Sequence, residues 1–134
     1  MKISVIILNY NVCYFLEQCI LSVEASLRYL DGEIIVIDNN SKDDSCEMVK
    51  RRFPHVTLIQ NKENVGFSIA NNQAVAEAKG EYLCILNPDT AVEESTFSRC
   101  IDYAETIDNM GALGVHLMDG TGNFLPESKR NVPT

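Results

Sequence analysis

Positive charge is scarce in this 134-residue sequence, which has 11 Lys and Arg residues against 19 Asp and Glu residues and a formal net charge of −8. Nucleic-acid backbones and anionic membranes both favour a basic partner surface, so the charge balance argues against either as the ligand. A nucleotide ligand stays open, because backbone N–H groups and a divalent metal can neutralise a diphosphate.

Long apolar runs and paired cysteines are also missing. No segment approaches the ~18 apolar residues of a membrane span, and Asn9 and Asn11 interrupt the N-terminal run that might otherwise resemble a signal peptide. The five cysteines form no C-x-x-C pair and no metal-ligand spacing. Scattered, odd-numbered thiols at core-patterned positions are typical of a reducing compartment. We expect a cytoplasmic protein, either free or bound peripherally at the inner face of the membrane.

Two glycine-rich nucleotide motifs are absent as well. The sequence has no G-x-G-x-x-G, which excludes a Rossmann dinucleotide fingerprint, and no G-x-x-x-x-G-K-[ST], which excludes a P-loop.

What the sequence does contain is four apolar runs that each end in asparagine or aspartate. The runs cover 4–8, 33–37, 56–59 and 82–86, and lead into Asn9, Asp38, Asn61 and Asn87. Continuous β-branched and leucine-rich runs are typical of strands buried on both faces of a parallel sheet. Ligands of such sheets bind outside the carboxyl ends of the strands. The pattern therefore predicts a ligand site at these polar strand ends.

Helical periodicity separates the runs. It predicts a first helix over about 12–29 and a second from a Ser41/Asp44 capping box to Phe53-Pro54. A third helix should run from the loop at 61–66 to a glycine C-terminus at Lys79-Gly80, and a fourth should follow Thr90, with Glu93 and Glu94 in its first turn. The inner faces should carry Ala70, Ala74 and Ala78 in the third helix and Phe97, Ile101 and Ala104 in the fourth.

Segment 111–117 resembles a further strand, followed by a turn at 119–122. The alternation of strands and helices predicts a doubly wound α/β fold with right-handed crossovers and helices on both faces of the sheet. We expect a single domain over residues 1–134.

Asp38 allows two interpretations. A carboxylate directly after a buried strand can accept hydrogen bonds from a nucleobase or a ribose, or it can cap the next helix and turn the chain. Because Ser41 can fill the capping role, we favour ligand contact for Asp38.

The segment Asn87-Pro88-Asp89-Thr90 allows the same pair of interpretations. Asp89 can hold Mg²⁺ or Mn²⁺ against a diphosphate, or the segment can be a turn with proline at a preferred position. Between Asp38 and Asn87, residues 61–72 are rich in asparagine. Asparagine amides both donate and accept hydrogen bonds and therefore suit sugar or ribose hydroxyls. The alternative interpretation is an irregular loop exposed to solvent. Its asparagines are Asn61, Asn64, Asn71 and Asn72.

Taken together and in order, these blocks resemble the inverting family 2 glycosyltransferases with a GT-A fold, especially their rhamnosyltransferase-like branch. The blocks are Ser4–Asn11, Glu33–Ser41, Asn64-Val65-Gly66-Phe67 with Asn71-Asn72, and Gly80–Thr90, and the resemblance covers most of residues 2–134.

The resemblance implies a role for each block. The residues after the first strand and Asp38 would hold the nucleobase and ribose, and Asp89, with Asn87 in the first acidic position of an Asp-x-Asp-like motif, would hold the metal and the diphosphate sugar. The chain departs from the family at Asn9, where many members have threonine, and at Asn87, which leaves one carboxylate where two are usual. The candidate donor-binding residues are Asn9, Tyr10, Asn11, Asp38, Asn40, Asn64, Gly66, Asn71, Asn87 and Asp89, with Asp89 as the metal ligand.

The implied activity is transfer of a hexosyl or deoxyhexosyl group from a UDP- or dTDP-linked sugar to a glycan or lipid-linked acceptor. The family's catalytic base lies beyond the metal motif, and we expect it past Thr134, in a longer chain. Two rivals remain: a non-catalytic nucleotide-binding or interaction module on the same fold, and a flavodoxin- or receiver-like domain. Asn9-Tyr10-Asn11 lacks the paired acids of a receiver.

Overall fold

The computed structural model describes residues 1–115, 118 and 121–123. Contacts within the chain divide it into two compact units, Met1–Arg99 and Cys100–Thr134. The first unit contains the whole sheet and the helices that cover it.

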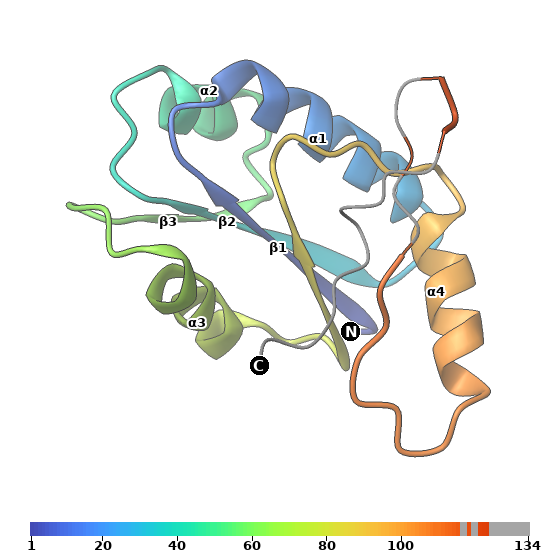
Figure 1. Ribbon diagram of the computed structural model, residues 1–134. Coiled ribbons are helices and arrows are strands. Elements are labelled where there is room, and N and C mark those ends of the chain that lie inside the picture. The colour runs from blue at the N-terminus through green and yellow to red at the C-terminus, as the bar shows by residue number, and fades with distance from the viewer. Residues whose placement is uncertain (116–117, 119–120, 124–134) are drawn as a thin grey trace. The chain divides into compact units, whose positions relative to one another are not determined.

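Strands and helices alternate along the chain (Figure 1). The elements are β1 (Ile3–Asn9), α1 (Cys13–Ser26), β2 (Gly32–Asp38), α2 (Ser45–Arg52), β3 (Thr57–Gln60), α3 (Phe67–Glu77), β4 (Tyr82–Leu86) and α4 (Thr96–Glu105). All four apolar runs are strands, as predicted.

The four strands form one parallel sheet in the order β3-β2-β1-β4. The register places Ile6 of β1 between Ile35 of β2 and Ile85 of β4, and it places Asn9 beside Asp38. The chain moves outward from β1 to β3 and then returns to the other side of β1 to form β4. The strand order therefore reverses between β1 and β4, which is where parallel sheets bind ligands.

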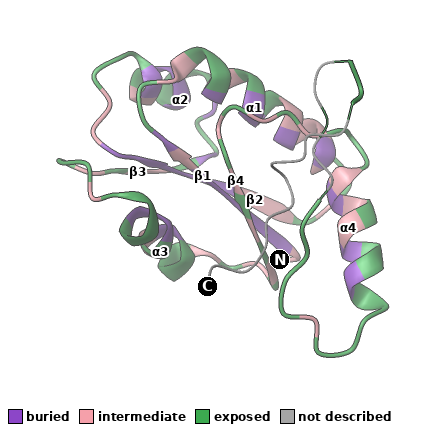
Figure 2. Ribbon diagram, in the orientation of Figure 1, coloured by how far each residue is buried: buried purple, intermediate pink, exposed green. Residues whose placement is uncertain are grey.

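The reversal also divides the helices between two layers. Helices α1 and α2 lie over one face of the sheet and α3 lies over the other (Figure 1). Alternate strand residues point to opposite faces, so Ile6, Ile35 and Ile37 form one buried cluster with Ala70 and Ala74 of α3. Figure 2 shows burial concentrated along the central strands. The predicted three-layer GT-A-type α/β architecture is confirmed.

Close packing of α3 depends on small residues. Ala70 and Ala74 are fully buried, and Ala78 packs against the same cluster, as predicted. The turn into β4 is equally tight, because a Cβ on Gly80 would lie 2.4 Å from the backbone nitrogen of Ser4. Gly80 is therefore needed for β4 to enter the sheet beside β1.

The boundaries of three predicted helices were wrong. Helix α1 ends at Ser26 rather than near residue 29, with Leu27 as its C-cap and a turn over 27–29. Helix α3 ends at Glu77 rather than at a glycine C-terminus at Lys79-Gly80, because Ala78 is already extended. Glu93 and Glu94 precede α4 instead of lying in its first turn. The predicted burial of Phe97, Ile101 and Ala104 is confirmed.

Part of the predicted fifth strand was also wrong. Residues 111–115 form no strand, although the segment combines glycine with the apolar residues Ala112, Leu113 and Val115. Residues 116–117, the Asp119-Gly120 half of the predicted turn and the segment from Phe124 onward lie outside the described residues.

Candidate functional site

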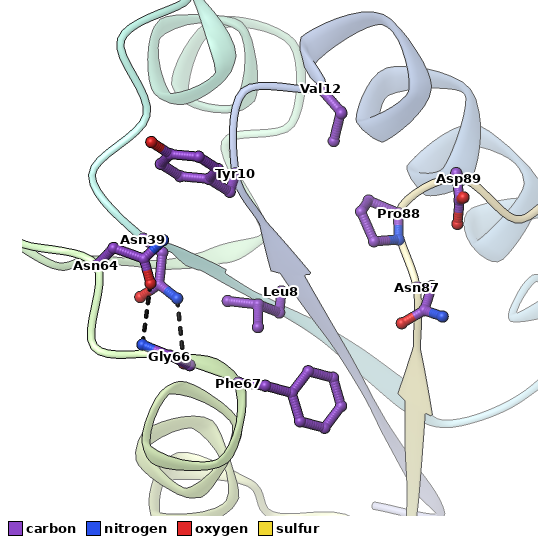
Figure 3. Close-up of a pocket in the computed structure, with 10 residues that line it drawn as sticks. All are labelled: Leu8, Tyr10, Val12, Asn39, Asn64, Gly66, Phe67, Asn87, Pro88 and Asp89. Carbon is purple, nitrogen blue, oxygen red and sulfur yellow. Dashed lines mark hydrogen bonds between the residues drawn. The ribbon is translucent and has the colours of Figure 1, made fainter.

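A pocket of about 520 Å³ lies at the carboxyl ends of β1 and β4, where the strand order reverses. Its volume is within the range of roughly 300–1,000 Å³ that is usual for small-molecule sites. Three parts of the chain contribute to it: the ends of β1 and β2, the loop before α3, and the segment after β4 (Figure 3). The lining residues are Leu8, Tyr10, Val12, Asn39, Asn64, Gly66, Phe67, Asn87, Pro88 and Asp89.

The structure brings half of the ten candidate residues together in this lining: Tyr10, Asn64, Gly66, Asn87 and Asp89. The other five lie behind the pocket or beside it: Asn9, Asn11, Asp38, Asn40 and Asn71. Their roles in ligand binding stay predictions.

Asn9 and Asp38 form a buried polar pair at the ends of β1 and β2. Asn9 is fully buried and Asp38 is 2% exposed. The Asn9 amide donates to Asp38 Oδ1 (2.9 Å) and to Ser41 Oγ (3.3 Å). The Ser41 hydroxyl donates to Asp38 Oδ1 (2.6 Å), and the Ser41 N–H donates to Asp38 Oδ2 (2.8 Å). Asp38 is therefore held from both neighbouring segments.

Ser41 does not cap α2, which corrects the expectation from the sequence. Its hydroxyl also accepts the Asn11 N–H (2.8 Å), so it joins the loops after β1 and β2. The N-terminus of α2 is tied by Asp43 instead, whose Oδ1 accepts the Ser45 N–H (3.0 Å). Asp38 is thus a turn-forming residue as well as a candidate ligand-binding residue, because its carboxylate accepts hydrogen bonds from both the N–H and the hydroxyl of Ser41.

Asn11 and Asn40 occupy positions where the backbone is left-handed. Their φ angles are 53° and 65°, a region that asparagine tolerates better than most residues. Asn11 Oδ1 also accepts the Lys42 N–H (2.7 Å). The left-handed backbone therefore explains why asparagine stands at these two positions, without any role in ligand binding.

The loop before α3 is tied to β2 by Asn39, which the candidate set lacked. Asn39 is 2% exposed, and its amide donates to the Gly66 carbonyl (3.2 Å) while its Oδ1 accepts from Asn61 (3.1 Å). Asn64 Oδ1 accepts the Gly66 N–H (2.9 Å), and both bonds to Gly66 appear in Figure 3. Gly66 has a φ of 83°, which favours glycine. These hydrogen bonds fix the position of the loop before α3 relative to the end of β2, at the wall of the pocket.

Asn71 faces inward from α3. Its amide donates to the Phe67 carbonyl (3.0 Å), and the residue is 7% exposed. It therefore belongs to the helix rather than to the pocket lining.

The apolar part of the lining was missed from the sequence. Leu8, Val12, Phe67 and Pro88 all line the pocket. Phe67 has helical spacing that places it on the same face as Ala70 and Ala74, at i+3 and i+7, which would predict a core residue. It is nevertheless 60% exposed, because it lies in the first turn of α3 beside the pocket, and only the structure shows this.

The segment after β4 is a turn that presents Asp89. The Thr90 N–H donates to the Asn87 carbonyl (3.2 Å), and the Thr90 hydroxyl donates to the same oxygen. Pro88 thus takes the position where turns favour proline. The turn, one of the two interpretations left open by the sequence, is present, and it leaves the exposed Asp89 side chain on the pocket rim (Figure 3).

A divalent metal can be tested against this donor set. The described residues contain no group of three or more His, Cys, Asp or Glu side chains that could hold a metal ion. Among the described residues that line the pocket, Asp89 is the only carboxylate. Mg²⁺ is commonly held by one or two carboxylates together with substrate phosphates and water, so Asp89 fits a metal that arrives with a diphosphate.

Two thiols lie close to the two carboxylates of the site. Burial, with smaller contributions from the charges of Cys84 and Asp89, raises the pKa of Cys19 to about 12. Burial, followed by the Asp38 charge and a hydrogen bond to it, raises the pKa of Cys46 to about 11. Both thiols therefore remain protonated at neutral pH and neither suits a nucleophilic role.

Within the described residues, no helix has the length and apolar character needed to cross a membrane.

Comparison with known proteins identifies the family. The model of the glycosyl transferase family 2 matches residues 4–132. The chain is 29% identical over 110 residues to the minor teichoic acid biosynthesis protein GgaB of Bacillus subtilis, covering 79% of this chain and 12% of GgaB. The other curated relatives described as glycosyltransferases agree with this family.

Two solved structures share the fold. The S. aureus TarS fragment 1–349 in complex with UDP-GlcNAc superposes with a TM-score of 0.70 at 21% identity, over 84% of this chain and 37% of TarS 1–349. The mannosyltransferase PcManGT of Pyrobaculum calidifontis, in complex with GDP-Man and Mn²⁺, superposes with a TM-score of 0.71 at 25% identity, over 76% of this chain and 32% of its own.

The chain spans less than half the length of each curated relative that it matches most strongly. GgaB, TarS and PcManGT are not named as rhamnosyltransferases, so membership of the rhamnosyltransferase-like branch stays a prediction.

Proposed function

Since the chain belongs to glycosyl transferase family 2, we propose that it forms the donor-binding domain of an inverting glycosyltransferase. The donor is a nucleoside diphosphate sugar, linked to UDP or dTDP, and the group transferred is a hexose or deoxyhexose. The acceptor is a glycan or a lipid-linked glycan. The setting is the cytoplasm, free or at the inner face of the membrane, in keeping with the odd number of core-patterned cysteines.

The observation that carries this proposal is the pocket at the reversal of strand order, whose rim holds Asp89. A nucleoside diphosphate sugar needs an aromatic or apolar surface for its base, hydrogen-bonding groups for its sugars, and positive charge for its diphosphate. The lining offers Tyr10 and Phe67 for the first, Asn39 and Asn64 for the second, and a metal held by Asp89 for the third.

The nucleobase and ribose belong beside β1 and β2. Tyr10 is 49% exposed and can stack on a base at the pocket wall. Asp38 Oδ2 accepts the Ser41 N–H, and in this proposal the same carboxylate meets a donor from the base or the ribose. Asn9 keeps that carboxylate in place, and the turn residues Asn11 and Asn40 shape the loops around it.

The diphosphate belongs beside the segment after β4. A metal bound there would supply a Lewis acid that stabilises the charge of the departing nucleoside diphosphate. Asp89 would hold it, and the neighbouring amide of Asn87 would orient a phosphate or sugar oxygen. Asn64 and Gly66 would face the sugar from the opposite rim, while the buried Asn71 supports the helix behind them.

Deprotonation of the acceptor hydroxyl requires a base. Asp89 is the only carboxylate among the described lining residues and is assigned to the metal, so none of these residues is assigned as the base. Donor binding and transfer are therefore separable properties, and donor binding is the one that this pocket supports.

The test is calorimetric titration of the chain with UDP, dTDP and GDP, each with and without Mn²⁺. We expect a pyrimidine diphosphate to bind, more tightly with Mn²⁺, and at 100 times its Kd to stabilise the fold by ~2.7 kcal/mol. Absence of any binding at millimolar concentration contradicts the proposal. A non-catalytic nucleotide-binding module would instead bind the nucleotide but neither transfer nor hydrolyse a radiolabelled donor, even in a longer chain that continues through the acceptor-binding region.

A further inference from the structure

The segment from Asn87 to Ser95 leaves the sheet after β4 and has few attachments before α4 begins. Its last ladder pairing is Leu86 with Ile7. Among the described residues, its hydrogen bonds to other elements are to α1, at Cys19 and Ser22, and, from Glu93 and Ser95, to α4, the helix that it leads into. Asp89 lies between these two attachment points.

The first attachment precedes Asp89 by two residues. The Cys19 thiol donates to the Asn87 carbonyl at 3.8 Å, which is the oxygen that also closes the turn to Thr90. Burial raises the pKa of Cys19 to about 12, so the thiol keeps its proton and remains a donor at any physiological pH. The bond is weak, as thiol bonds are, but it lies under the turn.

The second attachment follows Asp89 by three residues. The Val92 N–H donates to Ser22 Oγ at 3.2 Å, and the Ser22 hydroxyl donates in turn to the Cys19 carbonyl at 2.8 Å. The Ser22 hydroxyl thus links the backbone of the segment, at Val92, to the backbone of α1, at Cys19. Its orientation is fixed, because its own proton is already used within the helix.

We propose that Ser22, assisted by Cys19, is a positioning residue that sets the place of Asp89 on the pocket rim. The inference rests on the proposed function, in which Asp89 holds a metal against the diphosphate. With one carboxylate available, the metal depends on the placement of that carboxylate relative to the phosphates. Asp89 accepts no hydrogen bond from any side chain in the described part of the chain, so its place is set by its backbone.

The chain contains a matched control. Ser26 lies one turn further along α1, and its Oγ accepts the Phe97 N–H, also at 3.2 Å. Ser22 and Ser26 therefore make the same kind of bond from the same helix, Ser22 to Val92 within the segment and Ser26 to Phe97 in the first turn of α4. They differ in distance along the chain from Asp89, which is three residues for Val92 and eight for Phe97.

The first measurement needs no ligand. Amide hydrogen exchange by NMR, on the unaltered chain and on Ser22→Ala and Ser26→Ala, reports where each serine holds the backbone. We expect Ser22→Ala to speed exchange at Val92 and Thr90, and Ser26→Ala to speed it at Phe97 alone. Equal exchange at Val92 in the unaltered chain and in Ser22→Ala overturns the inference.

The second measurement concerns the metal. Calorimetry gives the factor by which Mn²⁺ tightens binding of whichever of UDP, dTDP and GDP the unaltered chain binds best. We expect Ser22→Ala to reduce this factor about 3- to 10-fold, the effect of losing one neutral hydrogen bond, and to leave affinity without Mn²⁺ unchanged. Ser26→Ala should change neither value, and Ser22→Thr, which keeps the hydroxyl, should restore the factor.

The outcomes separate the two proposals. If Mn²⁺ tightens binding equally in the unaltered chain, Ser22→Ala and Ser26→Ala, the positioning role is overturned and the proposed function stands. If Ser22→Ala weakens binding equally with and without Mn²⁺, its effect is general and positioning is again overturned. If the unaltered chain binds no nucleoside diphosphate, or binds one without help from Mn²⁺, the metal role of Asp89 fails and the inference fails with it.

Discussion

The two sides of the pocket differ in how their carboxylates are held. On the β2 side, Asp38 is 2% exposed and accepts hydrogen bonds from Asn9 and from both the backbone and the hydroxyl of Ser41. On the β4 side, Asp89 is exposed and is placed by a turn whose attachments lie on α1.

The difference matches what each side would have to do. A nucleobase presents fixed donors and acceptors, so a carboxylate that meets it gains from being preorganised. A metal brought in with a diphosphate needs an accessible carboxylate that can complete its coordination. Under the proposed function, the β2 side would be a rigid recognition side, and the β4 side an open side that the metal and diphosphate complete.

The largest expected effect is on stability. Asp38→Ala should lower the free energy of unfolding by about 2–4 kcal/mol, because it leaves the Ser41 N–H without its acceptor and the buried Asn9 amide with only its longer bond to Ser41 Oγ. Asp89→Ala should change it by less than about 0.5 kcal/mol, as for an exposed residue. Urea unfolding at pH 7 gives both values, and equal losses in the two variants would refute the contrast between the sides.

A smaller effect concerns acid. Burial alone would raise the pKa of Asp43, but hydrogen bonds from the Ser45 side chain and N–H and from the Cys13 N–H outweigh it and lower the pKa below its ordinary value of 3.8. Because the folded-state pKa is lowered, this stabilisation is present above the unfolded pKa of about 3.9 and is lost as the pH falls through the lower folded value.

We therefore expect Asp43→Asn to be less stable than the unaltered chain at pH 6, by less than about 1 kcal/mol since Asp43 is largely exposed. The gap should shrink as the pH falls below about 4. Urea unfolding from pH 6 to pH 2.5 measures it. A gap that stays constant over this range would assign the effect to geometry rather than to charge.

The smallest expected effect is an absence of reaction. Cys46 lies near Asp38 and Cys19 near Asp89, with pKa values of about 11 and about 12. Since the thiolate is the reactive form, neither should be alkylated by iodoacetamide at pH 8 in the native state. Peptide mapping after labelling checks this, with urea-unfolded protein as the positive control. Rapid native labelling of Cys19 alone would show that the β4 side opens more than its burial indicates.

Much of the fold followed from local pattern. The four buried runs and the alanine face of α3 are properties of short segments, and each was predicted correctly. The turn at Asn87–Thr90 was one of the two interpretations that its sequence allowed. The errors came where a segment depends on a distant partner. Ser41 has the composition of a helix cap, but Asn9 and Asp38, which the sheet brings beside it, use its hydroxyl and its N–H instead.

The sequence by itself determined that polar residues follow buried parallel strands, because strand burial and turn chemistry are local, and that alone placed a ligand site at one edge of the sheet. Only the tertiary structure decided which of those polar residues reach the pocket. An asparagine or aspartate side chain can serve a turn, a neighbouring strand or a ligand with the same atoms. The choice depends on partners far along the chain, such as Asp38, 29 residues from Asn9, and Val92, 70 residues from Ser22.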